Sequence, residues 1–321
     1  MQVIVLSEFG PPGVLMPATA DDPVPGTGQV VIAVDFANVT FVETQLRAGQ
    51  APFPVPADGL PMIPGNGVGG TIAALGPGVD AAWLGRRVVS STGGSGGYAE
   101  RVAVPTSALI EIPASVAIDD AVALLADGRT AGALVRAAAL RAGEWVLVEA
   151  AGGGVGTVLT QLCVRAGARV AAAARGEDKL KLARDLGAEL AVDYDAPGWA
   201  ALVRAAAGGV DVVFDGVGGA IAAEAFELLR AGGRMLSYGL ASGSFAGIPD
   251  DMAAARDVTL LRGVPVGPAE AVELTRAALD EAAAGRLRPV IGQRFGLVDA
   301  AKAHAAIESR STIGKTLLEI R

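Results

Sequence analysis

The stretch EAAGGGVGTVLTQL, residues 149–162, restricts the fold of this chain more than any other feature of its sequence. Four closely spaced glycines separate the apolar run 145–148 from a second apolar run with helical character. Glycine has no Cβ, so the backbone here can turn tightly and approach a phosphate group. Ala151-x-Gly153-x-x-Gly156 matches the dinucleotide-binding fingerprint with alanine in its first place, although an ordinary glycine-rich turn is the alternative.

Strand-like and helix-like segments alternate on both sides of this turn. We expect strands at 146–150, 169–173, 210–215, 233–238 and 258–261, and helices at 121–140, 155–166, 177–187, 198–207 and 219–230. This rhythm, which extends over residues 120–265, predicts a parallel sheet with helices on both faces.

The two flanking tracts have a different character. Residues 1–119 are rich in Val, Gly and Pro, and turn clusters such as GPPG and GPGVD separate short strand-like runs. This pattern predicts a β domain, either a barrel or a sandwich. The tract 268–321 is expected to hold a helix at 269–284, a strand near 289–295, a short helix at 298–309 and a last strand at 315–320.

The end of the second strand indicates which dinucleotide would bind. An NAD site usually places Asp or Glu there, about 20 residues after the glycines, to hold the ribose 2′-hydroxyl. Here Ala174 is followed by Arg175, and Lys179 comes one helical turn later. Two cations on one helix face suit a 2′-phosphate, so we favour NADP. The alternative is a solvated surface pair, because Glu177 and Asp178 lie between them.

Composition and charge exclude several other classes of protein. The net charge is −8, with no Lys/Arg cluster that would follow a nucleic-acid backbone. One cysteine, Cys163, and one histidine, His304, argue against a Cys/His zinc site, and both are expected to be structural. No uncharged apolar stretch reaches about 18 residues, and the N-terminus lacks a basic leader. We therefore expect a cytoplasmic protein with neither nucleic-acid nor membrane partners.

Several strings, in order along the whole chain, carry a family resemblance. They are VTFVETQLRAG (39–49), LGRRVV (84–89), GGYAERVAVP (96–105), AAGGGVG (150–156), LARDLGAELAVDY (182–194), DVVFDGVGG (211–219), GGRMLSYGLASG (232–243) and AHAAIESRSTIGKTLL (303–318). With them the chain resembles the medium-chain dehydrogenase/reductase superfamily, and within it the zinc-free quinone oxidoreductase (zeta-crystallin-like) branch.

The resemblance implies an α/β fold of two domains. A GroES-like catalytic domain would span residues 1–121 and be completed by 265–321, and a Rossmann NADP-binding domain would span 122–264. It also implies a homodimer that pairs through the sheet edge at 258–266. The alternative is a monomer in which the helix at 269–284 covers that edge.

The resemblance also implies a set of cofactor-binding residues for NADP(H). These are Thr130, Gly153, Val155, Gly156, Arg175, Lys179, Tyr194, Gly216, Val217, Tyr238, Gly239, Arg310 and Lys315. The hydroxyl of Thr40, or alternatively a backbone N–H, is expected to hydrogen-bond the acceptor oxygen; the proton would come from solvent, and no general acid is identified. No metal site is expected, since the zinc-ligand positions of zinc-dependent relatives read Thr44-Gln45 and Gly65-Asn66-Gly67.

The substrate wall departs from the pattern of the family. Thr40 replaces an asparagine, Gln45 and the loop GQAPFP (49–54) replace tyrosines, and Asp127 and Arg129 are candidate wall residues. The predicted activity is hydride transfer from NADPH to a quinone or an α,β-unsaturated carbonyl. The alternatives are an enoyl-thioester reductase of polyketide or fatty-acid metabolism and a non-catalytic NADPH-binding protein.

Overall fold

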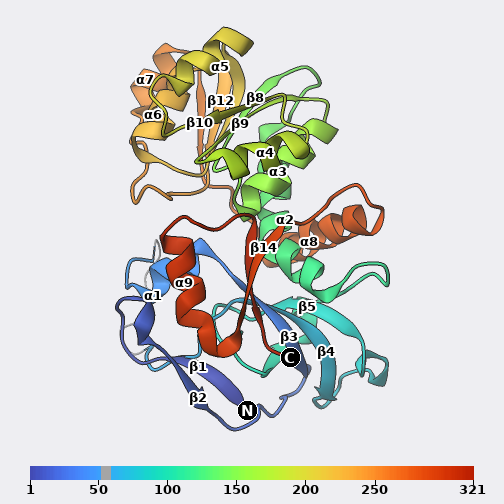
Figure 1. Ribbon diagram of the computed structural model, residues 1–321. Helices are drawn as coiled ribbons and strands as arrows, with labels where there is room; N and C mark the ends of the chain where they lie inside the picture. Colours follow the sequence, from blue (N-terminus) through green and yellow to red (C-terminus); the bar gives the residue numbers. More distant parts are fainter. Residues whose placement is uncertain (52–58) are drawn as a thin grey trace. The chain divides into compact units, whose positions relative to one another are not determined.

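The computed structural model describes residues 1–51 and 59–321 (Figure 1), so the last three residues of the loop GQAPFP lie outside the described part. The chain divides into two compact units. Unit 1 comprises Met1–Ala126 and Ala271–Arg321, and unit 2 comprises Asp127–Glu270. Each unit is built around its own sheet.

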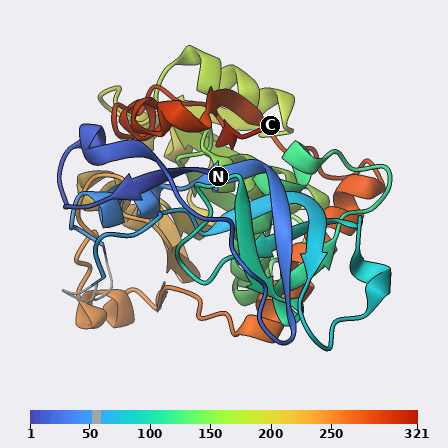
Figure 2. The ribbon, with the colours of Figure 1, turned by 90° about the horizontal axis from the view of Figure 1, so that it is seen from below.

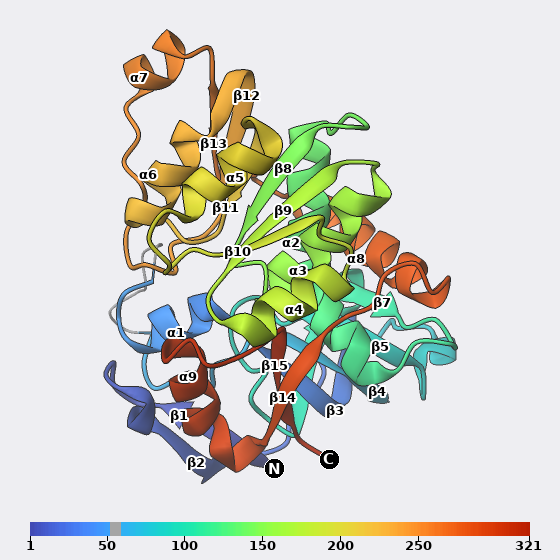
Figure 3. The same cartoon turned by 45° about the horizontal axis from the view of Figure 1, so that its top comes forward.

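Unit 2 contains a parallel sheet in the strand order β10-β9-β8-β11-β12-β13. Its strands are β8 (Trp145–Glu149), β9 (Arg169–Ala174), β10 (Leu190–Asp193), β11 (Val210–Asp215), β12 (Leu229–Ser237) and β13 (Thr259–Arg262), and Figure 3 shows them side by side. The central strands β8 and β11 are buried along nearly their whole length, as expected for parallel strands covered on both faces. The strand order reverses between β8 and β11, which makes their carboxyl ends the switch point of the sheet.

Helices cover both faces of this sheet. They are the end of α2 (Ile118–Ala138), α3 (Gly154–Arg165), α4 (Glu177–Asp185), α5 (Trp199–Ala207), α6 (Gly219–Glu227) and α7 (Asp250–Ala255). Trp199 of α5 and Phe226 of α6 pack with Leu147 and Val213 of the strands in one core. Side chains alternate along a strand, so Val146 and Val148 face the opposite side, and α3 packs against their strand.

Unit 1 is a β domain with few helices. In the described residues its larger sheet follows the order β14-β15-β3-β4-β5-β7, with β6 paired to β3, and β1 and β2 form a separate pair. The strands are β1 (Gln2–Leu6), β2 (Leu15–Thr19), β3 (Gln29–Val39), β4 (Gly67–Leu75), β5 (Arg87–Ser91), β6 (Arg101–Pro105), β7 (Leu109–Glu111), β14 (Ile291–Gly296) and β15 (Lys315–Glu319). The C-terminal strand β15 lies antiparallel to β3, so both ends of the chain belong to this unit (Figure 2).

The described helices of unit 1 include α1 (Phe41–Arg47), the beginning of α2, most of α8 (Pro268–Ala283) and α9 (Ala300–Glu308). The predicted α/β architecture, with one parallel-sheet unit and one β domain, is confirmed. Strand β10 was not among the predicted strands. It has only four residues at the sheet edge, three of them half-exposed, so it lacks the apolar run that marks the central strands.

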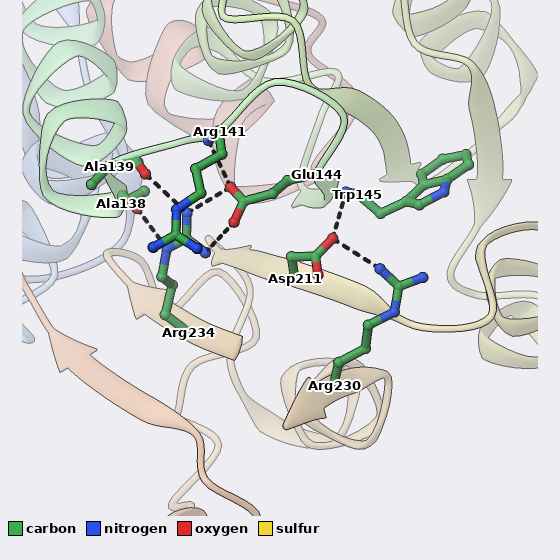
Figure 4. A network of polar contacts seen from close by, with 8 residues as sticks. All are labelled: Ala138, Ala139, Arg141, Glu144, Trp145, Asp211, Arg230 and Arg234. Carbon is green, nitrogen blue, oxygen red and sulfur yellow. Dashed lines mark hydrogen bonds and ion pairs between the residues drawn. The ribbon is translucent and has the colours of Figure 1, made fainter. Parts of the chain in front are cut away.

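The amino ends of the strands in unit 2 are held by a polar network (Figure 4). Arg234 donates to both carboxylate oxygens of Glu144, at 2.9 and 2.8 Å, and also to the carbonyl of Ala138 at the end of α2. Asp211 accepts from the backbone N–H of Trp145 at 2.7 Å and from Arg230 at 2.9 Å. These contacts join β8, β11 and β12 at the end of the sheet opposite the glycine turn.

Among the described residues, no helix combines the length and the apolar character needed to cross a membrane.

Candidate cofactor site

The glycine turn joins β8 to α3 at the switch point of the sheet. Gly153 precedes the first helical residue, with an extended backbone (φ −87°, ψ 174°) and no side-chain cap. The N–H groups of the first helical turn therefore have no acceptor within the helix and face outward at its positive end. A Cβ on Gly156 would lie 2.8 Å from the Cα of Ala151 and closer still to the carbonyl oxygen of Ala150, so no larger residue fits there.

Gly153 differs from its neighbours in the turn. A Cβ at this position would meet only the carbonyl oxygen of Ala150, at 3.3 Å, and Gly153 itself is half-exposed. At Gly152, by contrast, a Cβ would lie 2.6 Å from the Cβ and Cγ of Lys179. The aliphatic part of Lys179 therefore lies across the turn, which brings this predicted cation beside the predicted diphosphate site.

Arg175, the second predicted cation, follows the last residue of β9. It is exposed and forms an ion pair with Asp195, in the loop after β10. This hydrogen bond raises the pKa of Arg175. Asp193, the last residue of β10, accepts a hydrogen bond from the N–H of Gly176 at 3.0 Å, and Tyr194, between Asp193 and Asp195, is half-exposed. The structure thus brings Arg175, Lys179 and Tyr194 to one edge of unit 2, together with two carboxylates that were not predicted.

The carboxyl ends of β11 and β12 provide the next group of predicted residues. Gly216 and Val217 follow β11, while Tyr238 and Gly239 follow β12, and the N–H of Tyr238 donates to the carbonyl of Asp215 at 2.9 Å. A Cβ on Gly216 would lie 2.6 Å from the hydroxyl oxygen of Tyr238. The ring of Tyr238 thus extends over this turn, and glycine is required beneath it.

Two acidic residues that were not predicted lie under these turns. Glu149 ends β8 and Asp215 ends β11, and both are fully buried. Asp215 accepts hydrogen bonds from the N–H groups of Val217 and Gly218, at 3.1 and 2.7 Å. A charged residue that closes an apolar run, as in WVLVE, was the sequence signal that could have identified Glu149.

Helix α2 contributes Thr130, which is half-buried in unit 2, and the proposed wall residues Asp127 and Arg129. Asp127 is 6% exposed, and its carboxylate contacts the position of Gly154 in the first turn of α3. Burial lowers the pKa of Arg129, and the negative charge of Asp127 partly offsets this decrease. Asp127 is thus packed at the positive end of α3, where the helix dipole favours a carboxylate.

A cavity of about 320 Å³ lies at the carboxyl ends of β12 and β13 in unit 2. It is mainly apolar, and Tyr238, Phe245, Leu260 and Arg262 are among the residues that line it. Tyr238 therefore borders both this cavity and the turn at Gly216.

In unit 1, Thr40 is the N-cap of α1 rather than an open hydroxyl. The hydroxyl oxygen of Thr40 accepts a hydrogen bond from the N–H of Glu43 at 3.3 Å. The hydroxyl group in turn donates to the carboxylate of Glu43 at 3.0 Å, and the backbone N–H of Thr40 donates to the same carboxylate at 2.6 Å. This reciprocal capping box was visible in the sequence as Thr40-x-x-Glu43. Because the hydroxyl proton points to Glu43, the geometry weighs against the predicted bond from Thr40 to an acceptor oxygen.

The other predicted residues of unit 1 are Arg310 and Lys315. Arg310 is exposed after α9, in the left-handed region with φ 59°. Lys315 begins β15 and is 4% exposed. Burial raises the pKa of Glu43, and the charge of Lys315 partly offsets this rise. Lys315 thus lies close to the capping box of α1 in the interior of unit 1.

The two residues expected to be structural are both fully buried. The Nε2 atom of His304 lies 3.0 Å from the hydroxyl of Tyr98, and burial lowers the pKa of His304 to about 3. Burial raises the pKa of Cys163 to about 12. In the described ranges 1–51 and 59–321, no three His, Cys, Asp or Glu side chains gather as metal ligands would.

Two protein-family models match the chain. The model described as "Alcohol dehydrogenase GroES-like domain" matches residues 26–114, and the one described as "Zinc-binding dehydrogenase" matches residues 186–318. The first match falls within unit 1, and the second extends from α4 of unit 2 into β15 of unit 1.

Known proteins are similar over almost the whole chain. A probable quinone oxidoreductase of Schizosaccharomyces pombe is 34% identical over 98% of this chain and 96% of its own length. A 2-haloacrylate reductase of a Burkholderia species is 29% identical over 92% of this chain and 91% of its own length. A mycobacterial protein solved in complex with NADPH superposes with a TM-score of 0.89, at 34% identity, over 99% of this chain and 100% of its own.

Proposed function

Because the chain belongs to the medium-chain dehydrogenase/reductase superfamily, in its zinc-free quinone oxidoreductase branch, we propose that it is an NADPH-dependent reductase. Its acceptor is a quinone or an α,β-unsaturated carbonyl compound. The names of its relatives support both acceptor classes, since they include quinone oxidoreductases and a 2-haloacrylate reductase. The NADPH-bound relative supports the choice of cofactor.

The geometry of the glycine turn carries this proposal. The open side of Gly153 and the outward N–H groups of α3 suit a diphosphate, which is stabilised at a helix N-terminus. Lys179 lies across the same turn, and Arg175 lies at the end of the neighbouring strand, where the 2′-phosphate of NADPH would be held. A carboxylate in the place of Arg175 would instead suit NAD.

The remaining cofactor assignments are part of the proposal. Gly216, Val217, Tyr238 and Gly239 follow strands at the carboxyl edge of the sheet, where ligands bind in open parallel sheets. Thr130 would bind the amide of the nicotinamide, and Arg310 and Lys315 would complete the site from the returning segment. When bound, NADPH supplies the hydride, and the chain orients the acceptor against it.

The names of the relatives, which include quinone oxidoreductases and a 2-haloacrylate reductase, support a conjugated acceptor. A conjugated acceptor is already activated toward hydride, whereas a simple ketone or alcohol benefits from a metal ion. We propose a homodimer and a cytoplasmic location as further parts of this function, and size measurement and cell fractionation test them.

A screen for oxidation of NADPH tests the function directly. The purified protein is mixed with NADPH and, separately, with a quinone, an enone or a crotonyl thioester, and absorbance at 340 nm is followed. Turnover with the quinone or the enone is expected. Turnover with the thioester alone would favour an enoyl-thioester reductase. Tight NADPH binding without turnover of any acceptor would favour a non-catalytic binding protein.

A further inference from the structure

Two fully buried carboxyl groups, those of Glu149 and Asp215, end neighbouring strands at the switch point of the sheet in unit 2. Strands β8 and β11 are parallel, and their register pairs Val148 with Phe214, so the next residues along are Glu149 and Asp215. Glu149 is followed immediately by the glycine turn, and Asp215 by the turn at Gly216. The pair therefore lies beneath both turns of the candidate cofactor site.

The hydrogen bonds divide unequally between the two groups. Asp215 accepts from the N–H groups of Val217 and Gly218, and its other oxygen accepts from the hydroxyl of Ser237 at 2.7 Å. Among the described residues, Glu149 accepts one bond, at 3.3 Å from the N–H of Val217, and its buried Oε1 atom has no hydrogen-bond partner. Asp215 therefore has more hydrogen-bond donors around it than Glu149 has.

Two adjacent buried carboxyl groups ionise together only at a high cost in free energy. Burial, followed by the charge of Asp215 and a hydrogen bond with it, raises the pKa of Glu149 well above its ordinary range. Burial and the neighbouring Asp215 therefore favour the protonated form of Glu149, which can donate a hydrogen bond to Asp215. Asp215 in turn holds the two N–H groups that begin the turn after β11.

The groups around this pair are also acids. Tyr238 lies over Gly216, and its pKa is raised by burial and then by the charges of Glu149, Asp215, Asp127 and Tyr194. Ionisation of Glu149 would add a negative charge to this acidic surrounding, directly under the turn that suits a diphosphate. The ionised carboxylate of Glu149 and the negative charge of the diphosphate would repel each other through a region of low dielectric constant.

We propose that Glu149 is a positioning residue that must be protonated for the cofactor to bind, so that NADPH affinity falls as Glu149 ionises at alkaline pH. The inference rests on the proposed function, because it assumes that a dinucleotide phosphate occupies the glycine turn. The neutral carboxyl donates to Asp215 and keeps the turn at Val217 in place. The ionised form repels both Asp215 and the diphosphate.

The test measures the Kd for NADPH by its fluorescence between pH 7.5 and pH 9.5, at constant ionic strength, for the wild type and for Glu149→Gln. Glutamine has the shape of the protonated acid but does not titrate. The wild-type Kd is expected to rise with pH, by up to about tenfold per pH unit once Glu149 is ionised in the free protein. In Glu149→Gln this rise is expected to be absent or much smaller.

A matched control is Glu144→Gln, at the other end of the same strand. It is expected to keep the wild-type pH dependence of the Kd. If Glu149→Gln shows the same alkaline rise as the wild type, the titrating group lies elsewhere and the proposal fails. It also fails if the wild-type Kd is constant over this range.

Stability gives a second measurement that needs no cofactor. A carboxyl whose pKa is raised by folding makes the folded state bind more protons, so the free energy of unfolding falls as pH rises. Glu149→Gln is expected to remove part of that fall, and an unchanged fall contradicts the proposal. If the wild type binds no NADPH at any pH, the proposed function fails, whereas pH-independent binding overturns only this inference.

Discussion

The guanidinium group of Arg175 is ion-paired with the carboxylate of Asp195, across the carboxyl ends of β9 and β10. Both side chains are more than one-third exposed, so the pair is screened by water and contributes little stability. Its consequence is for binding, because Asp195 neutralises part of the charge that would attract a 2′-phosphate. We therefore infer that Asp195 competes with the proposed 2′-phosphate contact of Arg175.

We first predict that Asp195→Asn strengthens NADPH binding by about two- to fivefold, the range expected for an exposed ion pair. Arg175→Ala is expected to weaken it by about 1–3 kcal/mol, since a charge-assisted bond to phosphate is lost. Neither change should alter the Kd for NADH appreciably. Dissociation constants for both cofactors at one salt concentration check this, and wild-type protein that binds NADH as tightly as NADPH would contradict the assignment.

Our second prediction separates the two roles of the glycine turn. Gly156→Val is expected to abolish NADPH binding and destabilise unit 2, because a side chain there collides with the backbone of Ala150 and Ala151. Gly153→Ala is the matched variant, since its extended backbone accepts alanine and its Cβ would meet only the carbonyl oxygen of Ala150, at 3.3 Å. It should keep its stability within about 1 kcal/mol but bind NADPH more weakly. Normal NADPH binding by Gly156→Val would make the turn purely structural.

These positions show how far the sequence could be interpreted. The glycine turn and the alternation of buried strands with helices were enough to predict the parallel sheet, since central strands are apolar throughout. Strand β10 was missed because it is short and half-exposed at the edge. Its position depends on pairing with β9, and the local pattern of residues does not encode that pairing.

The polar residues of the site were harder to predict. Arg175 and Lys179 were predicted as cofactor residues because their positions after β9 follow a rule for nucleotide sites, and this role stays a prediction. Asp195 and Asp215 were missed, since only the packing of neighbouring strands brings them beside Arg175 and Glu149. For Thr40 the sequence did contain the signal, a Thr-x-x-Glu capping box, which competes with the catalytic role assigned from the resemblance.

The third prediction concerns the ion pair of Glu144 and Arg234 (Figure 4), whose side chains are 13% and 17% exposed. The hydrogen bond from Arg234 lowers the pKa of Glu144 in the folded state. The stabilisation is therefore present above the unfolded pKa, near 4.3, and is lost as pH falls through the folded pKa. Glu144→Gln should cost about 1–3 kcal/mol at pH 7.5.

Urea unfolding at several pH values measures this cost. The difference between the wild type and Glu144→Gln should shrink as the pH is lowered toward 3. Glu189→Gln is the control, because its pair with Arg169 is about half exposed and screened by water, so its loss is expected to change stability less. An equal loss of unfolding free energy in the two variants would show that burial of the Glu144–Arg234 pair does not increase its contribution to stability.

The fourth prediction is that activity does not depend on a metal ion. The described residues contain no cluster of metal ligands, and the Nε2 atom of the single histidine, His304, is within hydrogen-bond distance of Tyr98. Dialysis against a strong chelator should leave the rate of NADPH oxidation with a quinone unchanged. Stoichiometric zinc in the purified protein, with activity that chelation removes and zinc restores, would overturn this prediction.

The last prediction is a homodimer that extends the parallel sheet across a two-fold axis. Strand β13 is the end strand of the sheet in unit 2, and an uncovered strand edge offers backbone groups for pairing with another chain. The competing idea was that the helix at 269–284 covers this edge. Most of that helix, α8, belongs to unit 1, where Thr275 bonds to the carbonyl of Leu125 on α2.

Light scattering at micromolar concentration distinguishes the two states, since a monomer has a mass of 32.0 kDa and a dimer twice that. Leu260 is a poor target for mutation because it packs against the core of unit 2. Val264 follows β13 and is half-exposed, so Val264→Lys should shift the dimer toward monomer with little change in NADPH affinity. Leu202→Lys changes an exposed leucine on α5 and should leave the dimer intact. A wild-type mass near 32.0 kDa would refute the dimer, and equal dissociation by both variants would place its interface elsewhere.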